Sequence, residues 1–109
     1  MKELNVGLIM GRHQMPVKEY IFDSIEDVLD FDELTEVAVD FFRSRKDVDR
    51  FNIYITGLTT ATLAIVNGWL LTNQFAAENA PKVVFFHYDR DADCYAMQYM
   101  AALPYPYGN

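Results

Sequence analysis

The chain has 109 residues, of which 51% are hydrophobic, 15% aromatic and 23% charged, and its formal net charge at pH 7 is −7. This composition excludes intrinsic disorder, collagen and low-complexity sequence, and the length suits one domain with its own core. Because a negative field repels phosphate backbones, the charge argues against a protein that coats DNA or RNA.

The amino-terminal part of the chain predicts two strands. The first covers residues 4–10 and ends at Gly11, and Pro16 then interrupts regular structure. Apolar and polar residues alternate over residues 17–22, which predicts a short second strand.

A helix is predicted to begin after Asp30. This residue can cap the helix, and Glu33 stands three positions on, at the spacing of a capping box. The apolar face of the helix contains Phe31, Leu34, Ala38 and Phe41. A separate turn of helix is predicted just before it, over residues 24–29.

The middle of the chain predicts a strand followed by a second helix. Alternation over residues 51–56 indicates the strand, which Gly57 ends. The helix begins at Thr59 or Thr60 and continues to about Phe75. It is apolar on much of its circumference, so we expect it to be covered on two sides or to lie at a subunit contact.

The carboxyl-terminal part predicts a hairpin. Pro81 restarts the chain, residues 82–88 form an apolar strand, and residues 94–100 form its partner. The segment from 51 to 88 therefore predicts a right-handed βαβ unit, which implies parallel strands. We expect a single α/β domain over residues 1–102, a small Rossmann-like sandwich with two main helices and an antiparallel hairpin, and a flexible tail of Pro and Tyr over residues 103–109.

Two strand-end loops carry the chemistry of the predicted binding site. One follows the strand that ends near residue 56, where backbone N–H groups and a helix start would face an anion. The other follows the first strand and offers a guanidinium and an imidazole. The predicted ligand-binding residues are Arg12, His13, Thr56, Gly57, Thr59 and Thr60.

Each loop also has an interpretation without a ligand. In the first, Gly57 makes the turn and Thr59 or Thr60 caps the helix. In the second, Arg12 and His13 are solvated and pair with the acidic segment between residues 19 and 49, which holds eleven acidic and three basic residues.

No metal or cofactor is expected. Asp89, Asp91 and Asp93 are spaced like the start of a calcium loop, but Cys94 replaces its glycine and Met100 its glutamate. A charged hairpin turn explains the run. Cys94 is the single cysteine, so a disulfide within the chain and a zinc–thiolate site are excluded. Together with an amino terminus without the apolar core of a signal peptide, this leads us to expect a cytoplasmic protein.

Aromatic residues gather near the carboxyl end of the chain. Such residues are favoured at protein interfaces, and the last strand would be an edge that can pair with its copy or with a partner. They can equally cover a small core. The predicted interface residues, which would serve a homodimer or another protein contact, are Trp69, Tyr95, Tyr99 and Tyr105.

Residues 7–17, 54–61 and 87–89 resemble small uncharacterised proteins of phages and other mobile elements. The resemblance implies no catalytic residue, only a setting in which small acidic proteins bind host or defence components. A looser likeness is to Rossmann-type sensors of nucleotide signals, which bind ligand at loops placed like residues 12–14 and 56–60. This likeness is an analogy of fold, from which function does not follow.

Two functions follow from these patterns, and both are binding functions. The first is a cytosolic protein that binds a nucleotide or another phosphate-type anion at residues 11–14 and 56–60. The alternative is an acidic interaction or inhibitor module that docks on a basic, nucleic-acid-binding protein surface. An enzyme with His13 as general acid or base is less favoured, because no local spacing fixes a carboxylate–histidine pair.

Overall fold

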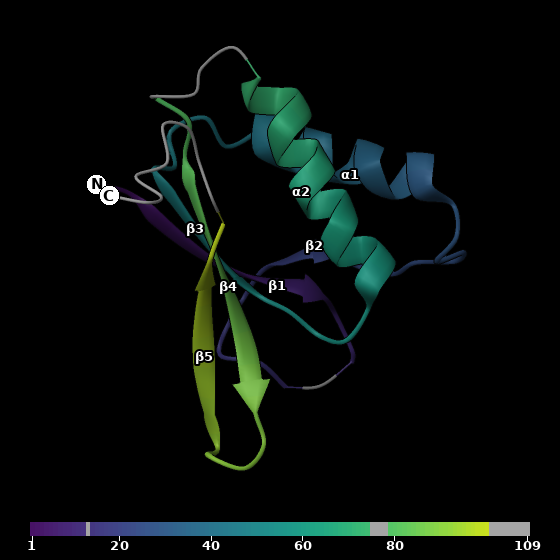
Figure 1. Cartoon of the computed structure of the whole chain (residues 1–109). Helices are drawn as coiled ribbons and strands as arrows, with labels where there is room; N and C mark the ends of the chain where they lie inside the picture. The colour runs from purple at the N-terminus through teal and green to yellow at the C-terminus, as the bar shows by residue number, and fades with distance from the viewer. Residues whose placement is uncertain (13, 75–78, 101–109) are drawn as a thin grey trace, which may run out of the picture.

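The computed structural model describes residues 1–12, 14–74 and 79–100. Five strands form one sheet in the order β2-β1-β3-β4-β5 (Figure 1). Their bounds are β1 Glu3–Ile9, β2 Tyr20–Phe22, β3 Arg50–Tyr54, β4 Lys82–Asp89 and β5 Cys94–Tyr99. The first four strands of this order are parallel, and β5 is antiparallel to β4. The predicted α/β fold, with a βαβ unit and an antiparallel hairpin, is confirmed.

Two helices connect the parallel strands. α1 (Phe31–Arg43) joins β2 to β3, and α2 (Thr59–Asn73) joins β3 to β4. Both lie on the same face of the sheet and pack against each other (Figure 1). Alternation along β3 sends Phe51 and Ile53 into the core beneath them. The opposite face of the sheet has no helix over it in the described parts of the chain.

The start of α1 is as predicted. The Asp30 carboxylate accepts a hydrogen bond from the Glu33 backbone N–H at 3.2 Å. Its core face holds Leu34, Ala38, Phe41 and Phe42. Two details of the prediction are wrong. Phe31 is exposed because it is the first residue of the helix and lies beyond the edge of the core. Residues 24–29 form no helix; they contain only a hydrogen-bonded turn in which the Asp30 N–H donates to the Asp27 carbonyl.

A close approach of the two helices depends on Gly68. A Cβ atom at this position would lie 2.6 Å from the Cβ of Ala38 and 3.0 Å from its carbonyl carbon. These separations are shorter than van der Waals contact, so only glycine lets α2 sit this near to α1. The glycine weakens the isolated helix by about 1 kcal/mol relative to alanine, and packing against α1 offsets that cost.

α2 is covered on one side only within the described residues. Its buried positions are Ala61, Ala64, Ile65, Gly68 and Trp69. Leu63, Leu70 and Leu71 are exposed instead. Trp69, predicted at an interface, lies in the core, and its indole N–H donates to the Pro81 carbonyl at 2.9 Å. The indole therefore anchors α2 to the start of β4. Neither helix is long and apolar enough to cross a membrane, as judged over the described segments.

Candidate functional site

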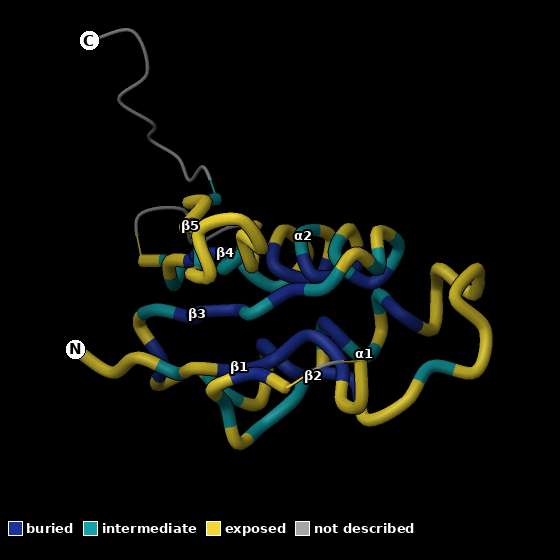
Figure 2. Tube along the Cα trace, turned by 90° about the horizontal axis from the view of Figure 1, so that it is seen from below, coloured by how far each residue is buried: buried dark blue, intermediate teal, exposed yellow. Residues whose placement is uncertain are grey.

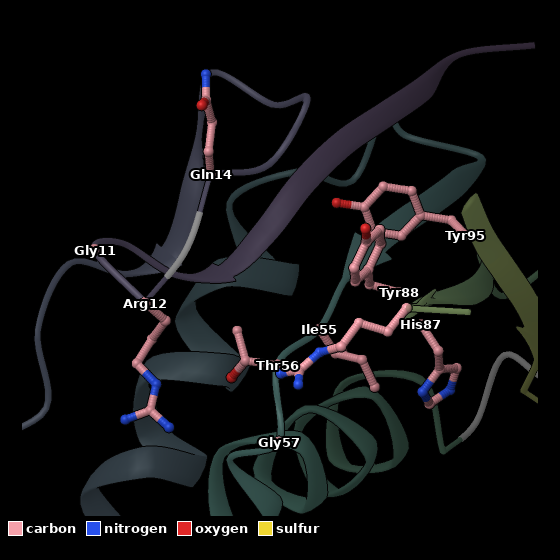
Figure 3. Close-up of a pocket in the computed structure, with 10 residues that line it drawn as sticks. Gly11, Arg12, Gln14, Ile55, Thr56, Gly57, His87, Tyr88 and Tyr95 are labelled. Carbon is pink, nitrogen blue, oxygen red and sulfur yellow. The ribbon is translucent and has the colours of Figure 1, made fainter. Parts of the chain in front are cut away.

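A pocket of about 950 Å³ lies at the edge where the parallel strands β1, β3 and β4 end (Figure 3). Two loops and a hairpin form it: the loop after β1, the loop between β3 and α2, and the hairpin of β4 and β5. Its lining residues are Gly11, Arg12, Gln14, Ile55, Thr56, Gly57, His87, Tyr88, Arg90 and Tyr95. Ligands of parallel α/β sheets bind at this kind of edge.

The charged side chains that line the pocket are arginines. Arg12 comes from the loop after β1 and Arg90 from the β4–β5 turn, and both are exposed. Neither forms an ion pair with any residue that the structure describes. No carboxylate is among the described lining residues. The described lining of the pocket is therefore cationic, although the chain as a whole carries a charge of −7 and three aspartates, Asp89, Asp91 and Asp93, belong to the turn that holds Arg90.

Two tyrosine rings form one wall of the pocket. Tyr88 and Tyr95 face each other across the hairpin, with ring centroids 5.6 Å apart, and lie side by side in Figure 3. Tyr54 meets the Tyr95 ring edge-on at 4.9 Å. Since each ring is held by a neighbour, the wall is already formed without a ligand.

Hydrogen bonding and burial raise the pKa values of both phenols. The Tyr88 hydroxyl donates to the Asp93 carboxylate at 2.6 Å, and this bond raises the pKa of Tyr88 above its ordinary value. Burial raises the pKa of Tyr95, and the nearby Tyr54 adds to this shift. Both side chains are uncharged around neutral pH, as tyrosine ordinarily is.

The loop between β3 and α2 presents backbone groups to the pocket. Thr56 Oγ1 accepts a long hydrogen bond from the Leu58 N–H at 3.4 Å. Leu58 is the residue that caps α2, and it forms no side-chain capping bond. The prediction that Thr59 or Thr60 caps the helix is wrong, because the helix begins at Thr59 itself. No acidic residue occupies the first turn, so α2 keeps the positive end of its dipole beside the pocket.

The structure brings together part of the predicted site. One pocket is lined by Arg12 together with Thr56 and Gly57, although Arg12 is far from the other two in sequence. Thr59 and Thr60 are the first residues of α2 and are not among the described lining residues. The Thr60 hydroxyl is buried and has no hydrogen-bond partner among the described residues. His13 and Tyr105 lie outside the described residues.

Five lining residues were not among those predicted to bind the ligand. One is Ile55, and the other four belong to the hairpin: His87, Tyr88, Arg90 and Tyr95. The signal for the hairpin was present. A strand over residues 82–88 that runs parallel to the strand over 51–56 must deliver its following turn to the same edge. His87 donates or accepts a hydrogen bond with Gln98 at 2.8 Å, and Figure 3 shows it pointing away from Tyr88.

The aspartates of the β4–β5 turn shape the turn itself. Asp89 Oδ1 accepts hydrogen bonds from the N–H groups of Asp91 and Ala92, and Asp93 adopts a positive φ of 50°. This geometry is that of a charged hairpin turn, which the sequence favours as the alternative to a calcium loop. Within the described segments, no group of three or more His, Cys, Asp or Glu residues is placed to hold a metal ion.

Comparison with known proteins identifies no relative. No protein-family model matches the chain, and neither a curated protein nor a solved structure matches it. The function therefore has to be inferred from the chemistry of the pocket.

Proposed function

We propose that this protein binds a nucleotide, or a similar phosphate-type anion, in the pocket at the carboxyl ends of β1, β3 and β4. One observation carries the proposal. In a chain of net charge −7, the charged residues that line this pocket are Arg12 and Arg90, with no carboxylate among the described lining residues. A cationic concavity on an acidic protein attracts anions to that place and repels them elsewhere.

The phosphate of the ligand fits the arginine side of the pocket. A guanidinium presents a planar fork of donors that matches two phosphate oxygens, and such charge-assisted bonds are stronger than neutral ones. Arg12 and Arg90 come from separate loops and line the same pocket. Gly57 is exposed, and a Cβ there would meet nothing within 4 Å, so a phosphate can approach the backbone at the start of α2 closely.

The base of the ligand fits the tyrosine side. An aromatic face binds any nucleobase by stacking, whatever its hydrogen-bonding edge. Tyr88 and Tyr95 offer such faces within the same pocket as the arginines. This combination favours a nucleotide over a simple inorganic anion. We favour binding over catalysis because the lining histidine, His87, is hydrogen-bonded to an amide and not to a carboxylate.

A thermal-shift series tests this function. A nucleotide at about 100 times its dissociation constant stabilises the fold by about 2.7 kcal/mol, which raises the melting temperature of a domain of this size by several degrees. We expect a shift with nucleoside phosphates, a smaller one with inorganic phosphate and the smallest with unphosphorylated nucleosides. The shift should be lost in Arg12→Ala and kept in Arg43→Ala, because Arg43 is an exposed arginine of α1 that is not among the described lining residues. Equal shifts with nucleosides and nucleotides would contradict a phosphate site.

A second candidate function is docking on a basic protein surface. The exposed carboxylates of one segment form no ion pair with the described residues: Asp23, Glu26, Asp27, Asp30, Asp32, Glu33, Glu36 and Asp40. Four of them line a hollow of about 420 Å³ beside α1, namely Glu26, Asp27, Asp30 and Glu33. Exposed Leu29 and Phe31 lie next to it in sequence. A lysine or arginine of a partner fits such a hollow, and the apolar pair supplies contact area.

Ionic strength tests this docking surface. A partner captured from cell lysate by the immobilised chain should be released between low and physiological salt, because exposed charges are screened over about 10 Å at 0.1 M. The double variant Asp27→Asn and Glu33→Gln should retain much less of that partner. A partner that is held equally at all salt concentrations would count against the acidic surface.

A further inference from the structure

The outer side of β5 is an unpaired sheet edge. β5 pairs with β4 on one side, and no described strand lies on its other side (Figure 1). Figure 2 shows this strand exposed along most of its length. Tyr99 and Met97 are 61% and 56% exposed. The edge therefore presents backbone hydrogen-bonding groups as well as side chains to solvent.

The strand register shows which backbone groups point outward. The Met100 N–H donates to the Val83 carbonyl at 3.0 Å, and residues alternate along an antiparallel pair between facing the partner strand and facing away. Gln98, Ala96 and Cys94 therefore direct their N–H and C=O groups toward β4. Those of Tyr95, Met97 and Tyr99 point away from the sheet. These three residues leave a regular row of donors and acceptors.

β5 carries none of the features that protect natural edge strands. Such strands are usually shortened, bulged, or marked by a lysine or a proline. Here Cys94–Tyr99 has the sequence CYAMQY, with no charged residue and no proline. Its register with β4 runs without a bulge from Asp89↔Cys94 to Val84↔Tyr99. The unpaired backbone groups of such an edge can form hydrogen bonds with another strand.

We propose that β5 pairs with β5 of a second copy of this chain, antiparallel and around a two-fold axis at Met97. The sequence of the edge is self-complementary about that residue, because tyrosines stand two positions away on each side, at Tyr95 and Tyr99. The axis then places Tyr95 of one copy opposite Tyr99 of the other, and Met97 opposite Met97. All three side chains lie on the helix-free face, where aromatic pairs across strands stabilise a sheet.

Charge favours a second copy as the occupant. Two chains of net charge −7 repel each other wherever acidic surfaces meet. β5 is an uncharged strand on this acidic molecule, so pairing here brings no two carboxylates directly opposite each other. The contact is also isologous, which is the commonest geometry of homodimers. It joins the two sheets into one, in which Met97 on the axis stands opposite Phe86, and Phe86 stacks on Tyr54.

Sedimentation of the full chain and two variants of Met97 tests the pairing. We expect the wild-type chain to sediment at twice its mass of 12.6 kDa. Met97→Pro should sediment as a monomer, because proline removes an outward N–H without removing a bond to β4. Met97→Ala keeps that N–H and should remain dimeric at high concentration. A monomeric wild type, or a Met97→Pro variant that still dimerises, overturns the proposal.

Cross-linking tests the register without a proline. In a Cys94→Ser background, Met97→Cys places two thiols on the axis, where hydrogen-bonded partners have Cα atoms about 5.5 Å apart and a disulfide can form. Mild oxidation should yield a covalent dimer. Gln98→Cys is the matched control, because its side chain lies on the other face and away from its copy. Failure of Met97→Cys to cross-link, or equal cross-linking of both variants, refutes a two-fold axis at Met97.

Discussion

Replacing Phe51 by alanine will lower the free energy of unfolding by about 3–5 kcal/mol, the usual cost of emptying a fully buried aromatic site. Phe51 is completely buried in β3. Its ring centroid lies 5.4 Å from that of Phe41 and 5.0 Å from that of Phe42, and the three rings join α1 to the sheet. A domain of this length has about 5–15 kcal/mol of stability, so the loss takes a large share of it.

Urea and thermal unfolding measure this effect. The melting temperature should fall by about 12–40 °C, given a loss of about 3–5 kcal/mol and about 4–8 °C per kcal/mol in small domains. Phe31→Ala is the matched control, since it deletes the same ring at a position that is 58% exposed. That variant should change stability by less than about 1 kcal/mol. Similar losses in both variants would mean that the three-ring cluster does not organise the core.

Local patterns predicted the elements of this fold because each is dictated by neighbours in sequence. Alternation along residues 51–56 and the Asp30 cap need no tertiary information, and both appear in the structure. The face on which α2 packs was harder to predict. Its sequence is apolar all round, and the buried side was decided by Gly68, which meets Ala38 of α1. That partner is thirty residues away. The only trace of the contact in α2 itself is the helical spacing of its small residues Ala61, Ala64 and Gly68, which a pattern of hydrophobicity does not single out.

The candidate site was predicted in part for the same reason. Arg12 and Thr56 follow strands that a pattern can recognise, so their common edge could be anticipated. Arg90 and Tyr95 enter the pocket only because β5 folds back beside β4 with Tyr88 opposite Tyr95. The same turn, considered alone, resembled a weak calcium loop. The predicted parallel strands place this turn at the pocket edge, but the pairing of Tyr88 with Tyr95 depends on the strand register, which local patterns do not determine.

Reversing both arginine charges in the pocket should abolish nucleotide binding without unfolding the protein. Charge-assisted hydrogen bonds contribute about 1.5–3 kcal/mol each, so Arg12→Glu with Arg90→Glu should weaken binding by at least about 100-fold. Both side chains are exposed and form no ion pair with the described residues, so the melting temperature without ligand should move little. Calorimetric titration with the nucleotide that gives the largest thermal shift measures the first effect, and thermal unfolding measures the second.

The single reversals separate a shared phosphate site from two independent contacts. If Arg12 and Arg90 hold one phosphate group, the two single variants will each lose much of the affinity and the double variant will lose less than their sum, because the first change already displaces the ligand. If they contact separate groups, the losses will add.

Tyr88→Ala should reduce the affinity for nucleotides and leave the affinity for inorganic phosphate unchanged, since stacking requires a base. Unchanged affinity in the double variant would remove the cationic pocket as the binding site and leave the acidic face beside α1 as the functional surface.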